Sequence, residues 1–283
     1  MRKRGPEVLP NAVSRPAPGE SFPLPARLID VHNHGKDGDE GTARIIELMD
    51  AHHIQWNLLL GLPAGARADN AAVLKAVGKH PDRLVGGAYA DPRDGQAAID
   101  EITRYHGEGF RVVKLFPNYG YFPDDEAVRP FFDAVAALGM AVLSHCGWLA
   151  PKAGRDYASY YSHPGRFEKL IRIYPDTVFI MAHMGGIAGF LESIMLTTRT
   201  PNTYVDCSPG QGMWVLETAG PMAATIPPDK LIWGCDSYNY EGLIPRYHNA
   251  LQAIGFGPHL QAIFHDNARG VLEKIGAIPA RES

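Results

Sequence analysis

The chain has 283 residues, of which 45% are hydrophobic and 20% charged, so it can bury one large core. Its formal net charge is −4 and its charges are mixed in sign, which excludes a strongly basic surface for nucleic acid or an anionic membrane. Only three cysteines occur, without CxxC spacing, and no stretch approaches the roughly 18 apolar residues of a membrane span. These properties favour a cytoplasmic protein with a small-molecule partner.

Residues 1–26 are rich in proline and show little periodicity. The prolines are Pro6, Pro10, Pro16, Pro18, Pro23 and Pro25. We expect this segment to be an extended N-terminal arm that lies over the surface or over a partner subunit, which is compatible with a homodimer. We expect one folded domain over residues 27–283.

From Leu28 onward, short apolar runs alternate with amphipathic stretches, a pattern typical of βα units around a parallel sheet. Helical spacing of apolar residues marks Gly41–His53 and Asp124–Leu138. The predicted strands are Leu28–His34, Ile54–Leu62, Leu84–Ala90, Arg111–Phe116, Ala141–Cys146, Thr177–His183, Thr203–Cys207 and Leu231–Asp236. This set predicts the α/β class and a single (β/α)8 TIM barrel.

A doubly wound open sheet is the main alternative for this pattern. That fold places a glycine-rich phosphate-binding turn after its first strand. This chain has Asp30-Val31-His32-Asn33-His34 at that position instead. The barrel is therefore favoured.

Unusual polar residues fall at the carboxyl ends of the predicted strands, namely His32, His34, His145, His183 and Asp236. In a (β/α)8 barrel these ends converge on one mouth, where active sites lie. A single histidine at a strand end is more often a hydrogen-bonding group than a ligand. Five coincident positions favour a functional site, because each unpaired buried polar group costs about 1–3 kcal/mol.

The same positions carry a family resemblance. The matching residues are Ile29-Asp30-Val31-His32-Asn33-His34, Val113-Lys114-Leu115, Ser144-His145, Ala182-His183-Met184-Gly185-Gly186, Trp233-Gly234-Cys235-Asp236-Ser237 and Asp266-Asn267-Ala268-Arg269. In this order they resemble the amidohydrolase superfamily, in the branch of aminocarboxymuconate-semialdehyde decarboxylase, resorcylate-type decarboxylases and several lactonases. The resemblance spans about residues 28 to 275.

The resemblance implies one divalent metal ion per chain, usually zinc, with manganese as the alternative. The implied ligands are His32, His34, His145 and Asp236. Three imidazoles and one carboxylate suit such an ion, which lowers the pKa of a coordinated water to roughly 7. Asp236 and His183 are the expected catalytic residues, with Asp236 accepting a proton and His183 acting beside the water or the substrate.

Lys114 is the ambiguous member of the set. It shares strand parity with Val112 and Phe116, so its side chain points either into the barrel mouth or outward. In binuclear members of the superfamily a carboxylated lysine on this strand bridges two ions, but the branch resembled here holds one ion or none. We expect an uncarboxylated cation that binds the substrate, and a pair with Asp91 is the alternative.

The connection from Gly147 to Gly165 is long and contains aromatic and basic residues. Long loops at this face of a barrel shape the pocket, so Arg155 and Tyr160 are candidate substrate contacts. Aromatic residues in such loops also serve to pack the loop itself. The cysteines, which are Cys146, Cys207 and Cys235, are expected to be buried reduced thiols that face away from the site.

Hydrolysis of a lactone, ester or amide is the favoured reaction, because the intact His-x-His pair supports a metal-activated water. Decarboxylation of an aromatic or unsaturated carboxylate would use the same residues, although some aromatic-acid decarboxylases replace the first histidine by glutamate. A metal-independent lactonase is a further alternative. A binding protein on a degenerate barrel would have lost at least one ligand, whereas this chain retains all five polar residues.

Overall fold

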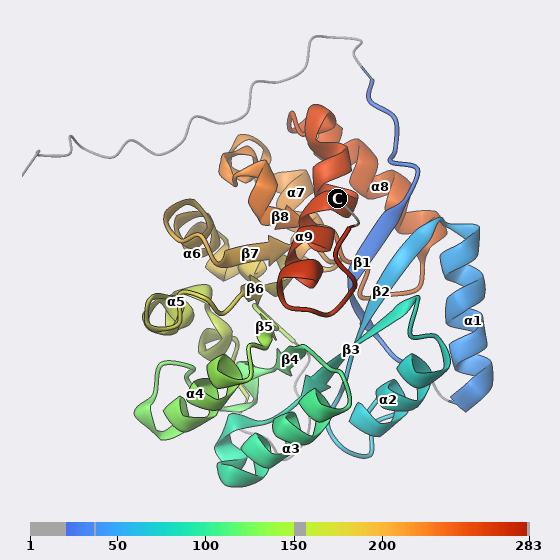
Figure 1. The fold of residues 1–283 in the computed structure, drawn as a ribbon. Coiled ribbons are helices and arrows are strands. Elements are labelled where there is room, and N and C mark those ends of the chain that lie inside the picture. Colours follow the sequence, from blue (N-terminus) through green and yellow to red (C-terminus); the bar gives the residue numbers. More distant parts are fainter. Residues whose placement is uncertain (1–20, 37, 150–156, 282–283) are drawn as a thin grey trace, which may run out of the picture.

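In a computed structural model the chain is described over residues 21–36, 38–149 and 157–281. Eight parallel strands are hydrogen-bonded in the order β1 to β8, and each strand is followed by a helix. Figure 1 shows the strands in a ring, with the helices around its outside. The predicted (β/α)8 barrel is therefore confirmed.

The element bounds show the repeat directly. The strands are β1 (Leu28–His34), β2 (Ile54–Leu60), β3 (Leu84–Tyr89), β4 (Val112–Leu115), β5 (Ala141–Ser144), β6 (Phe179–Met181), β7 (Thr203–Asp206) and β8 (Leu231–Ile232). The helices are α1 (Gly38–Ala51), α2 (Asn70–Lys79), α3 (Gln96–Gly107), α4 (Arg129–Ala137), α5 (Glu168–Ile173), α6 (Gly186–Arg199), α7 (Gln211–Thr218), α8 (Tyr240–Ala253) and α9 (Asn267–Lys274).

All eight predicted strands are present, but several end earlier than predicted. The sixth and eighth were expected to reach His183 and Asp236, and they stop at Met181 and Ile232. His183 and Asp236 have positive φ angles of 55° and 43°, and this left-handed backbone cannot continue an extended strand. The expected start of α4 at Asp124 was also wrong, because a 3-10 turn over Glu126–Val128 precedes it.

The ring closes between β8 and β1 through individual hydrogen bonds. The backbone N–H of Val31 donates to the carbonyl of Trp233 at 3.4 Å, and that of Asp236 donates to the carbonyl of His32 at 2.5 Å. The chain after β8 passes so close to β1 that a Cβ at Gly234 would lie 2.7 Å from the Cβ of His32. Only glycine allows this approach, which brings Asp236 beside His32.

The barrel interior is filled by an apolar cluster that includes Val31, Leu58 and Ile180. Val271 and Leu272 of α9 belong to the same cluster, and α9 contacts β1 and β8. The side chain of Asn267 donates to the carbonyl of Leu231, the first residue of β8, at 2.8 Å. Helix α9 therefore closes the amino-terminal end of the barrel (Figure 1), and the polar residues lie at the other end.

A larger apolar cluster lies between the strands and the outer helices. Cys146, Cys207 and Cys235 belong to it, and all three are buried free thiols. The prediction of buried, unpaired cysteines is confirmed.

Residues 1–20 of the expected arm lie outside the described residues. The part that is described lies against α8, where the N–H of Phe22 donates to the side chain of Gln252 at 2.8 Å. The imidazole of His248 donates to the carbonyl of Phe22, also at 2.8 Å. Among the described helices, none combines the length and apolar character needed to cross a membrane.

Candidate active site

A shift in strand register places the first two histidines. In the pairing of β1 with β2, the register slips between Asp30 and Asn33. Val31 points into the apolar interior, and the extra residue of this bulge then allows His32 and His34 to face the mouth. Asn33 points away from the mouth and donates to the hydroxyl of Tyr240 at 3.0 Å.

Both histidines are held through Nδ1. The Nδ1 of His32 lies 2.9 Å from Oδ2 of Asp206, and the Nδ1 of His34 lies 2.8 Å from the carbonyl oxygen of Leu60. Because a carboxylate and a carbonyl only accept, each ring donates from Nδ1, and in the neutral form it keeps a lone pair on Nε2. These Nε2 atoms lie 3.8 Å and 3.5 Å from Oδ1 of Asp236.

Asp236 joins the group from the loop after β8. Its Oδ2 lies 3.9 Å from Nε2 of His183, which follows β6. One ligand atom each from His32, His183 and Asp236 lie within 4.8 Å of one another. His32 and His183 are 1% and 4% exposed, so the group is almost dry, and the site opens to solvent at His34 and Asp236.

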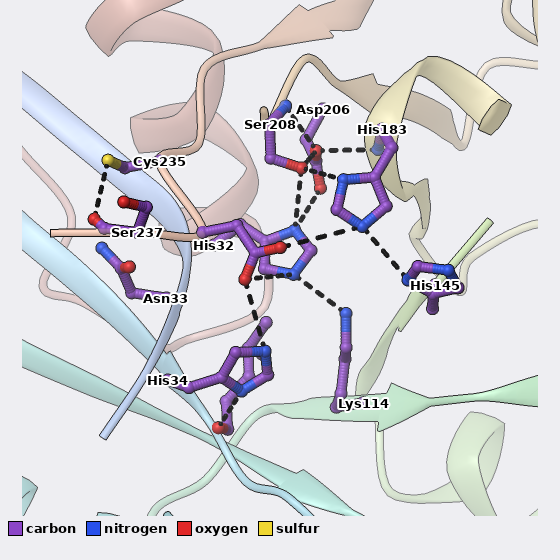
Figure 2. Close-up of polar contacts among 12 residues, drawn as sticks. His32, Asn33, His34, Lys114, His145, His183, Asp206, Ser208, Cys235 and Ser237 are labelled. Atoms are coloured by element: carbon purple, nitrogen blue, oxygen red, sulfur yellow. Dashed lines mark hydrogen bonds and ion pairs between the residues drawn. The ribbon is translucent and has the colours of Figure 1, made fainter. Parts of the chain in front are cut away.

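His145, at the end of β5, contacts His183 rather than Asp236. Its Nδ1 lies 3.1 Å from Nε2 of His183 (Figure 2). Its own Nε2 is buried and has no hydrogen-bond partner among the described residues. Its ring stacks on Phe116 with centroids 5.7 Å apart.

Lys114 points into the mouth. Its side chain is fully buried, and its Nζ lies 3.0 Å from Nε2 of His32 and 4.9 Å above the ring of Phe116. Burial lowers the pKa of Lys114 to about 8, so the amine remains largely protonated at pH 7. The alternative pair with Asp91 is wrong, because Asp91 bonds Arg93 at 2.6 Å.

Burial also decides the charge of the imidazoles. It lowers the pKa of His34 to about 3 and that of His183 to about 4, and it brings the pKa of His145 well below its usual range. Burial by itself would raise the pKa of Asp236, but the electrostatic influence of the neighbouring imidazoles and of Lys114 outweighs it and holds the pKa below its usual value. The site therefore combines neutral imidazoles with a carboxylate at neutral pH.

This donor set fits a divalent ion. The Nε2 lone pairs of His32 and His34 face the carboxylate of Asp236, and such a group attracts a cation because no proton lies between its atoms. The hydrogen bond from His32 to Asp206 is of the kind that orients a ligating imidazole. Lys114 donates to Nε2 of His32 in this structure, and a bound ion would displace the ammonium from that nitrogen.

Two polar residues of the site were missed at the sequence level, Asp206 and Ser208. Both are fully buried, and Ser208 lies 2.8 Å from Nδ1 of His183 through its hydroxyl. Asp206 ends the apolar run Thr203-Tyr204-Val205 as a lone carboxylate. The signal that marked His145 and Asp236 was therefore present here too, at the end of the seventh strand.

Of the two loop candidates, Tyr160 lies in the described part of the chain, and its ring contacts are with other aromatic residues. Tyr160 is 51% exposed, and its ring packs against Tyr161 and Phe122 with centroids 4.5 Å and 5.9 Å apart. Its aromatic side chain packs the loop, which was the alternative expectation. Arg155 lies outside the described residues.

A separate cleft of about 700 Å³ is lined by residues of α2 and α3, such as Asn70 and Glu101, and by the segments that follow β2 and β3. None of its lining residues belongs to the histidine group. We place the chemistry at the histidines, because the convergent ligand atoms lie there.

The family profile described as amidohydrolase matches residues 61–274. A solved structure of a probable 2-pyrone-4,6-dicarboxylic acid hydrolase from Acinetobacter baumannii is 20% identical, with a TM-score of 0.61 over 88% of this chain and 99% of that one. The structure of 2,6-dihydroxybenzoate decarboxylase from Rhizobium is 19% identical, with a TM-score of 0.64 over 88% of this chain and 99% of that one. The structure of manganese-bound 5-carboxyvanillate decarboxylase from Novosphingobium aromaticivorans is 17% identical, with a TM-score of 0.57 over 82% of this chain and 80% of that one.

A search of curated proteins gives no match. At these identities the solved structures show the fold, and they include both hydrolases and decarboxylases. The family profile covers most of the barrel, from the end of β2 to the last residue of α9. The chain therefore belongs to the amidohydrolase family.

Proposed function

We propose that this chain is a metal-dependent hydrolase that opens a lactone, ester or amide bond in a small, flat, anionic substrate. The observation that carries the proposal is the convergence of the Nε2 lone pairs of His32 and His34 on the carboxylate of Asp236. His183 stands at the same group, with its Nε2 3.9 Å from that carboxylate.

The proposed ligands of the ion are His32, His34, His145 and Asp236. His145 can offer its Nε2, which is buried and without a partner among the described residues. When bound, one zinc or manganese ion would supply a Lewis acid and an activated water. The manganese-bound decarboxylase of similar fold supports manganese as one of the two candidate ions.

Proton transfer in the proposed reaction is assigned to His183. His183 is neutral at pH 7, since burial lowers its pKa to about 4. Its Nε2 faces Nδ1 of His145 in this structure, and it can exchange that contact for a proton from the attacking water. The water oxygen bonds to the carbonyl carbon, the bond to the leaving oxygen or nitrogen breaks, and the proton passes from His183 to that leaving atom. Asp236 is ionised, and its carboxylate faces the Nε2 atoms of His32, His34 and His183.

Lys114 and Phe116 favour a flat anion as the substrate. The buried ammonium of Lys114 can bind a carboxylate or a developing oxyanion where little water competes. The ring of Phe116, which also stacks on His145 and lies 6.5 Å from the ring of His34, provides an aromatic surface beside it. The dicarboxylic substrate named for the similar pyrone hydrolase has this chemistry.

The expected cytoplasmic location is part of this proposal. Buried free thiols accord with a reducing cytoplasm. The homodimer and the substrate contact of Arg155 stay predictions.

The product distinguishes hydrolysis from decarboxylation. We would incubate the purified protein with a panel of carboxylated pyrones, other lactones and hydroxybenzoates, and measure acid release by titration and carbon dioxide in the headspace. We expect a ring-opened acid from at least one lactone, with one acid equivalent per turnover and no carbon dioxide. Carbon dioxide from a hydroxybenzoate, with no lactone opened, would contradict the hydrolase and establish the decarboxylase.

A further inference from the structure

Asp206 contacts two histidines from separate segments, His32 of β1 and His183 of the turn after β6. Its Oδ2 lies 2.9 Å from Nδ1 of His32, and its Oδ1 accepts the backbone N–H of His183 at 3.0 Å. The N–H of Ser208 also donates to Oδ1, at 2.9 Å. A carboxylate with so many donors can only accept, so His32 carries its proton on Nδ1.

Ser208 extends this assignment to a second ring. A hydroxyl has one hydrogen, and the hydroxyl of Ser208 gives it to Oδ1 of Asp206. Its oxygen must then accept from Nδ1 of His183, which lies 2.8 Å away. His183 therefore carries its proton on Nδ1, and its Nε2 is a lone pair. The same oxygen also lies 3.2 Å from Nδ1 of His32.

The order of donors continues into a third ring. The Nε2 lone pair of His183 lies 3.1 Å from Nδ1 of His145, so this Nδ1 donates. His145 is left with a lone pair on Nε2, the buried atom that has no partner among the described residues. Figure 2 shows this series of contacts running from Asp206 through Ser208 to His145.

We propose that Asp206 and Ser208 are positioning residues that fix the proton on Nδ1 in three imidazoles at once. The three are His32, His183 and His145. Without the pair, each neutral ring is free to carry its proton on either nitrogen. With it, every Nε2 is held as an acceptor. The catalytic meaning of this order rests on the proposed function, since a metal ligand and a general base both need that lone pair.

Nitrogen NMR of histidine side chains tests the proposal. We would label the full chain with ¹⁵N-histidine, remove metal with a chelator, and record long-range proton–nitrogen spectra without substrate. We expect pyrrole-type Nδ1 and pyridine-type Nε2 signals for His32, His145 and His183. In Ser208→Ala, His183 loses its acceptor, and we expect its proton to redistribute toward Nε2. Ser193→Ala is the matched control, because its buried hydroxyl has no partner among the described residues.

An Nε2-protonated His183 in the parent, or an unchanged His183 in Ser208→Ala, would overturn the proposal. If Ser208→Ala does not fold, Asp206→Asn serves as the second variant, and the parent spectrum remains decisive by itself. For turnover we expect kcat of Ser208→Ala to fall by about 10–100-fold, with KM changed by less than about threefold. Because the spectra use neither metal nor substrate, they can fail while hydrolysis stands, and the product assay can fail while the spectra hold.

Discussion

Replacing Asp236 by asparagine should lower kcat by about 1,000-fold while the barrel stays folded. The carboxylate is shared by His32, His34 and His183 at 3.5–3.9 Å, so one substitution removes the one negative charge that, among the described residues, faces all three. Asparagine is the informative replacement, because it has the same size and tolerates the positive φ of 43° at this residue. The loss then reports chemistry rather than backbone strain.

The measurement is steady-state kinetics on the substrate that the panel identifies, with melting temperatures of both proteins. Asp229→Asn is a matched control, because Asp229 is exposed in the turn before β8. We expect this control to keep the kcat of the parent. An Asp236→Asn protein that retains more than about a tenth of the parent kcat would remove Asp236 from the mechanism.

The metal-free protein should lose stability steeply as the pH falls from about 6.5 to 4. Burial lowers the pKa of His34 to about 3 and of His183 to about 4, and that of His145 lies well below its usual range. In this interval the unfolded chain binds a proton at each of these imidazoles, which the folded chain does not bind. A histidine whose pKa is lowered by folding therefore contributes stability that is present above pH 6.5 and is lost as the pH falls below it.

Asp30 acts in the opposite direction. Burial raises its pKa to about 7, so the folded chain holds a proton there that the unfolded chain releases. Three imidazoles take up protons on unfolding and one carboxyl releases one, so the net uptake is about two protons. The free energy of unfolding then changes by about 2.7 kcal/mol per pH unit. Over two pH units this approaches the whole stability of a typical domain, about 5–15 kcal/mol.

Urea unfolding of chelator-treated protein at pH 6.5, 5.5 and 4.5 measures this slope. His34→Asn removes one of the imidazoles, so we expect its slope to be about half that of the parent. A free energy of unfolding that stays constant between pH 6.5 and 4.5 would show that these histidines are not buried as neutral groups.

The repeat of apolar runs was sufficient to predict the barrel, because eight strands buried on both faces leave a strong periodic signal. The polar strand ends at His145, His183 and Asp236 followed from the same pattern. Strand alternation also placed His32 and His34 on one face. It could not show that this face becomes the mouth only after the register shift at Asp30, since a bulge leaves no period in the sequence.

Backbone geometry accounts for what was missed. The positive φ angles at His183 and Asp236 end their strands early, and tertiary contacts rather than residue type impose them. Asp206 followed the same strand-end pattern as the residues that were identified, but its partners come from β1 and from the turn after β6. The role of Ser208 depends on a hydroxyl meeting two groups in space, which no spacing in the sequence predicts.

Metal content per chain, measured by plasma mass spectrometry together with activity, tests the central claim most directly. We predict about one zinc or manganese ion per chain, loss of both ion and activity in a His32→Ala, His34→Ala double variant, and recovery of chelated parent protein when either ion is returned. Parent protein that is fully active with no bound metal would contradict the claim. Asp236 and His183 would then have to activate water by themselves, as in a metal-independent lactonase.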